Sequence, residues 1–350
     1  MKEHTLSTAG DNGRALLALS TAVIGALAAR YVWRHTRFSF RGRVVLLTGG
    51  TRGLGLAMAR QLVDEGARLW LLARSSDELS EVRTELQARG RRVRTIRADI
   101  RDADTVARVV EEVVREAGHI DVLINNAGVI TVAPFAHTHL EDFTESLATH
   151  FWGPLRLIRQ ALPYLTCDGS GRIVNVSSIG GLVGVPHLSA YVAGKFALTG
   201  LSQALNAELK HEGIRVTTVT PGLMRTGSYV NARVRGQHRE EARWFSLSAA
   251  NPLSSKSADR AARQILDATR RGRATCTPGW QARAAHVASA AMPELSAAIA
   301  ALAAEHVLPG PSPEPDADEP RAARQIDQGW TRVLLPESTR RKFHQPPALS

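Results

Sequence analysis

The glycine-rich stretch at residues 48–55, Thr-Gly-Gly-Thr-Arg-Gly-Leu-Gly, constrains the fold more than any other feature of the sequence. It follows a short apolar run at 44–47, which predicts a buried strand, and it precedes apolar residues at helical spacing from Leu56 to Val63. Glycines at such a turn let the backbone approach a pyrophosphate closely, and the following helix offers its N-terminal amides. Strand, turn and helix together predict a dinucleotide-binding unit.

Alternating strand and helix patterns fill the middle of the chain, as a parallel sheet with crossover helices requires. The sequence predicts strands at 44–47, 68–74, 93–96, 122–124, 173–177 and 215–219. It predicts further helices at 102–118, 140–165, 190–212, 257–270 and 294–307. The last carries Leu295, Ile299 and Leu302 along one apolar stripe, which we expect to pack on the core; a second subunit and a membrane are the alternatives. The predicted fold class is therefore α/β, a Rossmann-type doubly wound parallel sheet in one catalytic domain, followed by a C-terminal extension that is partly helical and partly disordered.

A second group of residues, Ser178, Tyr191 and Lys195, lies far downstream of the glycine loop. Tyr191 and Lys195 are four residues apart, so on a helix they share one face. A phenol with a pKa near ~10 is a poor acid–base catalyst at neutral pH, and a neighbouring cation is expected to lower that pKa. Ser178 follows a predicted strand, at the sheet edge where open α/β folds bind ligands. These residues predict an acid–base site.

With these residues in place, the chain resembles a classical short-chain dehydrogenase/reductase (SDR) over residues 41–275. The resemblance rests on five motifs in the family's order, which are the glycine loop, Asn-Asn-Ala-Gly at 125–128, the serine, the Tyr-x-x-x-Lys pair and Pro-Gly at 221–222. The family's catalytic serine stands thirteen residues before the tyrosine, which selects Ser178 over Ser177.

The resemblance implies a catalytic role for Ser178, Tyr191 and Lys195 and a set of cofactor contacts around them, in which Asp99 matches the family's adenine-contacting aspartate. It also implies that residues 227–251 cover the substrate. The implied cofactor-binding residues, besides Tyr191 and Lys195, are Thr48, Gly49, Thr51, Arg52, Gly53, Leu54, Gly55, Arg74, Asp99, Asn126, Ala127, Gly128, Pro221, Gly222 and Thr226.

One position departs from the family pattern. The family usually has an asparagine, in an N-x-x-G setting before the serine strand, which holds a water of the proton relay. The matching run at 150–153 begins with His150 instead. Histidine donates and accepts hydrogen bonds and titrates near neutrality, so one interpretation is an altered relay. The other is a packed helix histidine with no catalytic part.

The end of the second predicted strand distinguishes NAD from NADP. An NAD-dependent protein places an acidic residue there to bind the ribose hydroxyls, whereas this chain has Ala73 followed by Arg74. Arg52 in the glycine loop adds a second cation. Guanidinium groups bind phosphate through paired donors, so two arginines favour the 2′-phosphate of NADP(H), although arginine is abundant throughout the chain.

Residues 15–33 are apolar apart from Arg30 and are followed by a run of cations. The segment is marginal in length for a bilayer span, which needs about 20 residues. It predicts a membrane anchor, and the positive-inside rule then leaves the catalytic domain in the cytoplasm. A cleaved signal peptide is a second interpretation. The third is a helix packed on a soluble cytoplasmic protein.

Composition limits the other function classes. The formal charge of +11 comes without a basic helix with interleaved aromatic residues or a zinc-finger spacing, so we expect no nucleic-acid partner. Attraction to anionic lipid or an arginine-rich solvated surface explains the charge. Cys167 and Cys276 lack metal-ligand spacing, and we expect no metal site. The expected partners are a small-molecule carbonyl or alcohol substrate and further copies of the chain in a homo-oligomer.

The sequence therefore predicts three regions: an N-terminal segment at 1–40, a catalytic Rossmann domain at 41–275 and an extension at 276–350 with a helix, a proline-rich linker and a basic tail. The expected activity is NADP(H)-dependent interconversion of a carbonyl and a secondary alcohol by hydride transfer, on a lipophilic substrate of steroid, retinoid or fatty acyl type. The alternative is a catalytically weak or inactive NADPH-binding regulator or scaffold.

Overall fold

The computed structural model describes Gly25 and residues 38–89, 93–165, 170–250, 255–326 and 341–343. The chain divides into two units, residues 1–39 and residues 40–350, and the fold below belongs to the second. Apart from Gly25, the candidate anchor at 15–33 lies outside the described residues.

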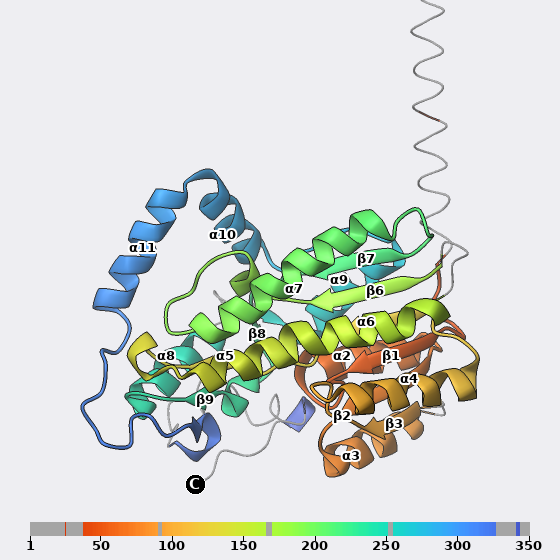
Figure 1. The fold of residues 1–350 in the computed structure, drawn as a ribbon, viewed down its shortest axis with the longest axis horizontal. Helices are drawn as coiled ribbons and strands as arrows, with labels where there is room; N and C mark the ends of the chain where they lie inside the picture. Colours follow the sequence, from red (N-terminus) through yellow and green to blue (C-terminus); the bar gives the residue numbers. More distant parts are fainter. Residues whose placement is uncertain are drawn as a thin grey trace, which may run out of the picture. The chain divides into compact units, whose positions relative to one another are not determined.

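Seven parallel strands form the central sheet in the order β11-β7-β6-β4-β1-β2-β3 (Figure 1). They are β1 (Val44–Thr48), β2 (Arg68–Ala73), β3 (Val93–Arg97), β4 (Val122–Asn125), β6 (Arg172–Val176), β7 (Arg215–Val219) and β11 (Thr275–Cys276). From β1 the chain adds β2 and β3 on one side and the later strands on the other, so β1 and β4 flank the switch point where such sheets bind ligands. The predicted Rossmann-type fold is confirmed.

Helices cover both faces of this sheet. The α-helices of the described part of this unit are α2 (Gly53–Asp64), α3 (Ser76–Gln87), α4 (Ala103–Ala117), α5 (Leu140–Leu147), α6 (Gly153–Ala161), α7 (Ser189–Glu208), α8 (His238–Ala250), α9 (Ala258–Arg270), α10 (Trp280–Ala291) and α11 (Pro293–His306). Figure 1 shows α4, α6 and α7 in front of the sheet, and α2 packs with α9 behind it.

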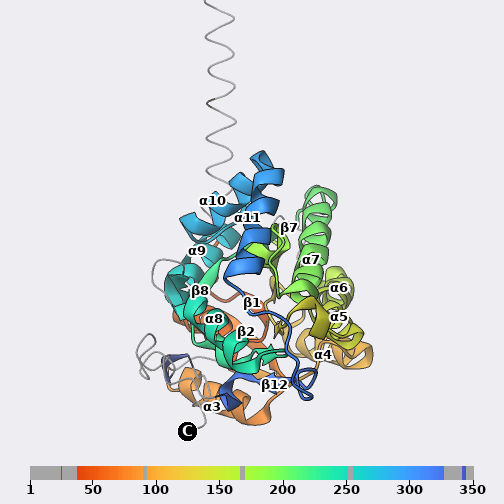
Figure 2. The same cartoon turned by 90° about the vertical axis from the view of Figure 1, so that its left-hand side faces the viewer.

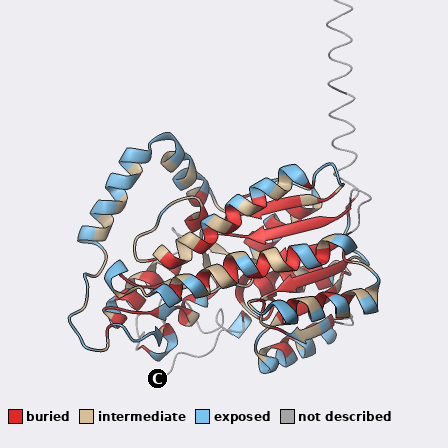
Figure 3. Cartoon of the chain, viewed as in Figure 1, coloured by how far each residue is buried: buried red, intermediate tan, exposed pale blue. Residues whose placement is uncertain are grey.

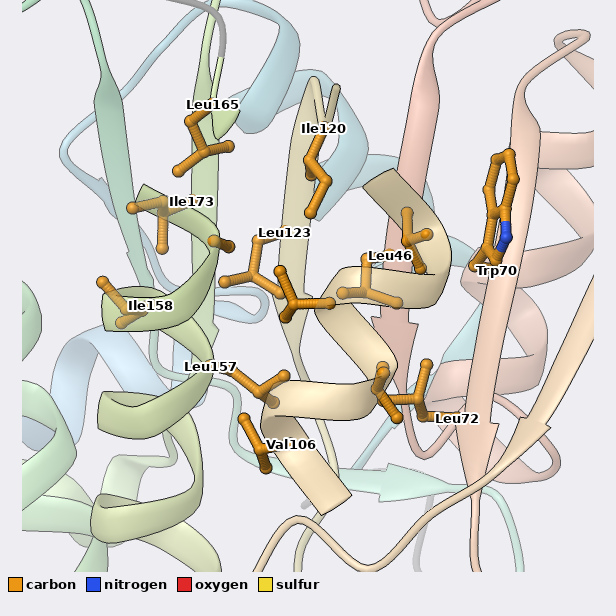
Figure 4. Packing of buried hydrophobic residues seen from close by; sticks show 14 of the residues in the cluster. Leu46, Trp70, Leu72, Val106, Ile120, Leu123, Leu157, Ile158, Leu165 and Ile173 are labelled. Carbon is orange, nitrogen blue, oxygen red and sulfur yellow. The ribbon is translucent and has the colours of Figure 1, made fainter. Parts of the chain in front are cut away.

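Apolar side chains join the sheet to the helices on its front face. Leu46, Trp70 and Leu72 project from the strands towards α4 and α6, which contribute Val106 and Leu157 (Figure 4). Burying each of these aliphatic side chains stabilises the fold by about 1.5–3 kcal/mol. This core holds the strand ends in register, and the strand ends in turn position the loops at the carboxyl edge.

The helix predicted at 140–165 is interrupted by a π-helical turn at Ala148–Trp152, between α5 and α6. The local cause is Pro154, because a proline lacks the amide that would bond to the carbonyl of His150 in a regular α-helix. Such turns often occur at functional sites, and this one contains His150.

Two small sheets extend the unit beyond the Rossmann core. β8 (Leu223–Arg225) pairs with β10 (Ser255–Ser257), and β12 (Arg321–Ala322), β9 (Arg233–Val234) and β5 (Thr131–Val132) form a three-stranded sheet. The C-terminal extension thus contributes a strand next to β9 (Figure 2).

The proline-rich segment differs from the expected disordered linker. The Ser312 amide donates to Nε2 of His137 (3.0 Å), and the Gly236 amide donates to the Ala317 carbonyl (2.7 Å). The Gln237 side chain also donates to the Gly310 carbonyl (3.1 Å). Proline removes backbone donors, but the remaining polar groups still find partners, so this segment is ordered along the surface near β9.

The helix predicted at 294–307 is α11, but it does not pack on the core. None of its residues is buried, and its apolar side chains are exposed to solvent. Among the described residues, no single helix is long and apolar enough to cross a bilayer; α10 and α11 reach that length and composition only together, as a pair bent by 118°.

Candidate active site

A cavity of about 490 Å³ lies at the carboxyl ends of the central strands. Every site residue predicted from the sequence lines it. These are Thr48, Gly49, Thr51, Arg52, Gly53, Leu54, Gly55, Arg74, Asp99, Asn126, Ala127, Gly128, His150, Ser178, Tyr191, Lys195, Pro221, Gly222 and Thr226.

The glycine loop forms a tight cradle at one end of the cavity. Gly49 has φ +66°, and a side-chain carbon at Gly55 would lie 2.0 Å from the Gly49 carbonyl oxygen, so no other residue fits there. The Thr48 hydroxyl accepts hydrogen bonds from the amides of Asn126 (2.9 Å) and Ala127 (3.0 Å), which ties the Asn-Asn-Ala-Gly segment to the loop. A close backbone turn before the N-terminus of α2 fits a pyrophosphate.

Arg52, the last residue before α2, is held by two polar side chains. Its guanidinium donates to Glu78 (3.1 Å) and to Asn231 (3.0 Å), and Glu78 also accepts from the Thr51 hydroxyl (2.6 Å). Burial lowers the pKa of Arg52, Glu78 opposes that effect, and Arg74 and Arg324 add to it. Arg52 therefore lies among other cations with one acid beside it.

Asp99, expected to contact adenine, forms an ion pair within the cavity wall. Its Oδ2 lies 2.6 Å from Nη2 of Arg101, and Arg101 also donates to Glu145 (3.0 Å). The Arg101 hydrogen bond lowers the pKa of Asp99, against a smaller opposing effect of burial. The carboxylate therefore stays ionised at neutral pH and remains an acceptor.

Ser178 and Tyr191 meet across the cavity. Ser178 is the second residue after the end of β6. It caps the short helix Ile179–Gly181, where its Oγ accepts a hydrogen bond from the Gly180 amide (3.1 Å). Its side chain also hydrogen-bonds to Tyr191, at the start of α7. The hydroxyl of Ser177 is instead bonded to the Lys195 carbonyl (2.9 Å) and to Thr199 (2.8 Å).

Lys195 is buried one helical turn after Tyr191. Its Nζ donates to the Val176 carbonyl (2.9 Å) and lies 5.7 Å from the centroid of the Tyr191 ring. Burial lowers the pKa of Lys195 to about 7. Burial also raises the pKa of Tyr191, and the Ser178 hydrogen bond only partly opposes this. The expectation of a lowered tyrosine pKa is therefore wrong for the protein alone, because burial outweighs the Ser178 hydrogen bond.

His150 uses both ring nitrogens within the protein. Nε2 lies 3.2 Å from the Val129 amide, which can only donate, so the ring proton is on Nδ1, 3.1 Å from the Ser146 hydroxyl. Burial, and to a lesser extent Lys195, lowers the pKa of His150 well below its usual value. The ring is neutral at pH 7 and packs edge-on against Tyr191, with centroids 5.4 Å apart. Its space comes from Gly194, where a side-chain carbon would lie 2.9 Å from Nδ1.

In the region expected to cover the substrate, 227–251, the structure describes residues 227–250, and part of them lines the cavity. It contributes Ser228, Asn231, Arg233 and Phe245 to the lining. Glu241 of α8 is fully buried and bonds His187 (2.8 Å) and Trp244 (2.6 Å). Since His187 shortly precedes Tyr191, this contact fixes α8 against the start of the catalytic helix.

Several contacts at the cofactor end were not anticipated from the sequence. Glu78 is one of them, although a signal exists, because Ser75 and Glu78 follow the capping pattern S-x-x-E and the Ser75 hydroxyl caps α3. Asn231 and Phe343, whose carbonyl accepts from the Gly53 amide (3.1 Å), reach the loop from distant parts of the chain, and Arg324 lies close enough to lower the pKa of Arg52. No local pattern marks those three.

Side chains that could bind a metal do not cluster among the described residues. In the described part of the chain, no three His, Cys, Asp or Glu side chains converge as metal ligands. Cys276 is a free, buried thiol.

Comparisons with known proteins agree with this geometry. The short chain dehydrogenase family profile matches residues 43–235. A fatty acyl-CoA reductase of Acinetobacter baylyi is 32% identical over 54% of this chain. An oxidoreductase of Mycobacterium tuberculosis named SadH is 32% identical over 71% of this chain and 90% of its own length. The dehydrogenase/reductase SDR family member 7B of Danio rerio is 33% identical over 61% of this chain and 72% of its own length.

The coverage of these relatives is uneven. The match spans 65% of the Acinetobacter reductase and 58% of an uncharacterized mycobacterial oxidoreductase. A crystal structure of L-sorbose reductase from Gluconobacter frateurii with NADPH and L-sorbose aligns with a TM-score of 0.62, at 26% identity, over 69% of this chain and 98% of that one. A short-chain dehydrogenase from Streptomyces avermitilis aligns with a TM-score of 0.65 over 77% of this chain and all of its own, at 28% identity. The chain belongs to the short-chain dehydrogenase/reductase family.

Proposed function

We propose that the protein is an NADP(H)-dependent oxidoreductase that interconverts a carbonyl and a secondary alcohol. The observation that carries this proposal is the meeting of Ser178, Tyr191 and Lys195 in the same cavity as the glycine-loop cradle. A phenol, a hydroxyl and a buried amine beside a dinucleotide site are the groups that proton transfer to a carbonyl oxygen requires. Residues 41–275 would form the catalytic domain.

The residues at the site divide the work between proton transfer and positioning. When bound, the nicotinamide cofactor supplies the hydride that reduces a carbonyl carbon. Tyr191, which is protonated at neutral pH and whose pKa burial raises further, donates its proton to the carbonyl oxygen. Ser178 hydrogen-bonds that oxygen. Lys195, when it carries its proton, stabilises the phenolate that remains.

The buried lysine makes this site sensitive to pH. Its pKa of about 7 means that the ammonium form is lost as the pH rises above neutrality. In the direction of reduction, a phenolate without a nearby cation is less stable, so turnover should fall above that pH. The pKa of about 7 belongs to Lys195 in the cofactor-free protein, and the charge of a bound cofactor changes it.

The choice of NADP(H) rests on the cations near Arg52. Arg52 and Arg74 line the cavity, and Arg324 is close enough to lower the pKa of Arg52. The end of β2 lacks an acidic residue. Guanidinium groups match a 2′-phosphate through paired donors. Glu78 is the opposing feature, because its carboxylate already holds Arg52 and must yield part of that contact to a phosphate. The sorbose reductase that aligns with this chain was crystallised with NADPH.

For the substrate we propose a lipophilic carbonyl compound of steroid, retinoid or fatty acyl type. The cavity lining includes Met224 of β8 and Phe245 of the covering region, and one relative is named a fatty acyl-CoA reductase. We also propose that residues 15–33 anchor the protein to a membrane with the catalytic domain in the cytoplasm, and that the protein forms a homo-oligomer.

A second candidate function is a catalytically weak NADPH-binding regulator. The observation that favours it is His150, whose two ring nitrogens already have partners in the protein and so leave no free nitrogen for a relay water. The intact group of Ser178, Tyr191 and Lys195 favours the enzyme.

Turnover of the full chain tests the proposal. The loss of reduced-nicotinamide absorbance would be followed with NADPH and, separately, NADH, against lipophilic ketones and aldehydes and against small polar ones. We expect turnover with NADPH and a lipophilic compound. Tight NADPH binding without turnover on any compound would favour the regulator, and equal rates with NADH would refute the cofactor assignment alone.

A further inference from the structure

The helices α10 and α11 carry an apolar surface that nothing in the described part of the chain covers. Leu295, Ile299 and Leu302 are 52%, 59% and 55% exposed. Figure 3 shows both helices largely exposed, and Figure 1 and Figure 2 show them as a pair extending from the rest of the unit. A water-facing helix normally carries polar residues on that side, so this surface calls for an apolar neighbour.

The residues of α11 sort into distinct faces. Leu295, Ile299 and Leu302 recur at i, i+4 and i+7 and form one exposed stripe, which we call the α11 stripe. The two acids, Glu294 and Glu305, are eleven residues apart, or three turns, so they share a neighbouring edge. Between those acids every residue except Ser296 is Ala, Leu or Ile. Helix α11 is therefore apolar around most of its circumference, with its large apolar side chains in one stripe and charge only at the two ends of one edge.

Cations and an aromatic ring lie at the start of the pair. Trp280, the first residue of α10, is 74% exposed. Arg283 of α10, Arg260 of α9 and Lys256 of β10 lie close enough together for the two arginines to lower the pKa of Lys256, in addition to the effect of its burial. Tryptophan and basic residues flanking an apolar surface are typical of elements that rest at a lipid headgroup layer.

We propose that α10 and α11 form a membrane-docking hairpin whose α11 stripe lies in the interfacial layer of a bilayer that contains anionic lipid. The cationic cluster of Lys256, Arg260 and Arg283 favours a lipid surface over a second copy of the chain. Phosphate headgroups complement these cations, whereas an identical copy presents the same positive cluster. The acids at both ends of α11 hold it parallel to the surface, since neither carboxylate can enter the hydrocarbon.

The dimensions of the hairpin agree with this arrangement. Helix α11 has 14 residues, about 21 Å at 1.5 Å per residue, which is shorter than the ~30 Å hydrocarbon core. The 118° bend between the helices returns the chain to the side from which it came. The hairpin therefore rests on one leaflet and does not cross it.

The hairpin also adjoins the cavity. A side-chain carbon at Gly222, which lines the cavity, would lie 3.3 Å from Cβ of Ala282 in α10. Docking through α11 would bring the lipid phase close to the site, which suits a lipophilic substrate. The docking itself is independent of the proposed reaction, because it depends only on surface residues.

Measuring the lipid contact of single labelled positions in the full chain tests this proposal. Such a measurement remains informative when another segment of the chain also binds the vesicle. A fluorescent label would be placed at Ile299→Cys and, as a control on exposed α3, at Glu81→Cys, both with Cys167→Ser. Cys276 can remain, because burial raises its pKa to about 11 and leaves it unreactive. Vesicles of phosphatidylcholine and phosphatidylglycerol would carry a nitroxide quencher on the acyl chain.

We expect several-fold stronger quenching at position 299 than at position 81. Leu302→Glu should remove most of that quenching, whereas the matched change Ala301→Glu, on the acidic edge, should leave most of it; NADPH binding by both variants checks that they are folded. Equal quenching at 299 and 81 in vesicle-bound protein would overturn the proposal. A second outcome would also overturn it: a dimer that shields the label at position 299 in the absence of lipid and that dissociates when Leu302→Glu is introduced. In that case a second copy of the chain would cover the α11 stripe.

Discussion

Replacing Lys195 with methionine should stabilise the cofactor-free protein near pH 7 and lose this advantage as the pH approaches the ordinary lysine pKa. Lys195 is 5% exposed, and burial lowers its pKa from 10.5 to about 7. In the unfolded chain the same amine keeps a proton up to a much higher pH. Between these two values the unfolded state binds more protons than the folded state, so the stability of the wild type rises with pH across this window. Methionine has no proton to bind and removes this dependence.

The magnitude follows from the size of the shift and from one lost contact. Each pKa unit corresponds to ~1.4 kcal/mol, so burying this amine destabilises the fold at pH 7 by on the order of 4 kcal/mol relative to a side chain that does not titrate. The substitution also removes the 2.9 Å bond to the Val176 carbonyl, and an unpaired buried carbonyl costs about 1–3 kcal/mol. The expected net gain in the free energy of unfolding at pH 7 is about 2 kcal/mol.

Urea denaturation of wild type and Lys195→Met at pH 7 and at a pH near 9.5 measures both quantities. Lys210→Met, at an exposed lysine just beyond α7, is the matched control and should show neither the gain nor the pH dependence. The difference between wild type and Lys195→Met should shrink by about 1.4 kcal/mol per pH unit over this range. A difference that stays constant with pH would refute the lowered pKa of the buried Lys195.

Three further outcomes follow from contacts around the cavity. Glu78→Gln should tighten NADPH binding several-fold and leave NADH binding nearly unchanged, because a neutral amide no longer repels the 2′-phosphate; nicotinamide fluorescence titration decides, and a weaker NADPH complex would contradict it. Arg324→Ala should lower the NADPH to NADH affinity ratio several-fold, whereas Arg321→Ala, which loses only a pair with Asp316, should not; equal losses for both cofactors would count against the role of Arg324. His150→Leu should lower stability by about 1–3 kcal/mol because it leaves two buried hydrogen-bond partners unpaired, and an unchanged melting temperature would refute that packing role.

The parts of the site that local sequence predicts are those that adjacent residues build. The glycine loop lies between β1 and α2, and Tyr191 and Lys195 share one helix face, so strand–turn–helix context and a four-residue spacing suffice to find them. Arg74 follows β2 directly, and its position is likewise set by the strand before it.

The contacts that the sequence did not reveal join distant segments. Asn231 is 179 residues from Arg52, and Phe343 comes from the far end of the chain. Their positions depend on how β9, β12 and the tail fold back, which periodicity does not encode. The tyrosine pKa is raised and not lowered for a related reason, because the sequence shows the neighbouring cation but not how far the fold separates the phenol from water.

The case of α11 shows a different limit. Its spacing of Leu295, Ile299 and Leu302 correctly predicts a helix with an apolar stripe. Periodicity indicates that such a stripe avoids water, but it does not identify the neighbour that covers it. The prediction of packing on the core chose the commonest neighbour, and the exposed stripe shows that the core does not provide it.

Comparing wild type with Tyr191→Phe in a single turnover decides whether Tyr191 is the proton donor of a carbonyl reductase. Single-turnover reduction of a lipophilic ketone by the full chain with NADPH would be compared between wild type and Tyr191→Phe, with the affinity for NADPH measured alongside. The phenyl ring keeps the packing against His150 but has no proton to donate. We expect the rate to fall by about 100-fold or more while NADPH still binds with similar affinity. An unchanged rate would contradict the assignment of Tyr191 and, with it, the proposed mechanism.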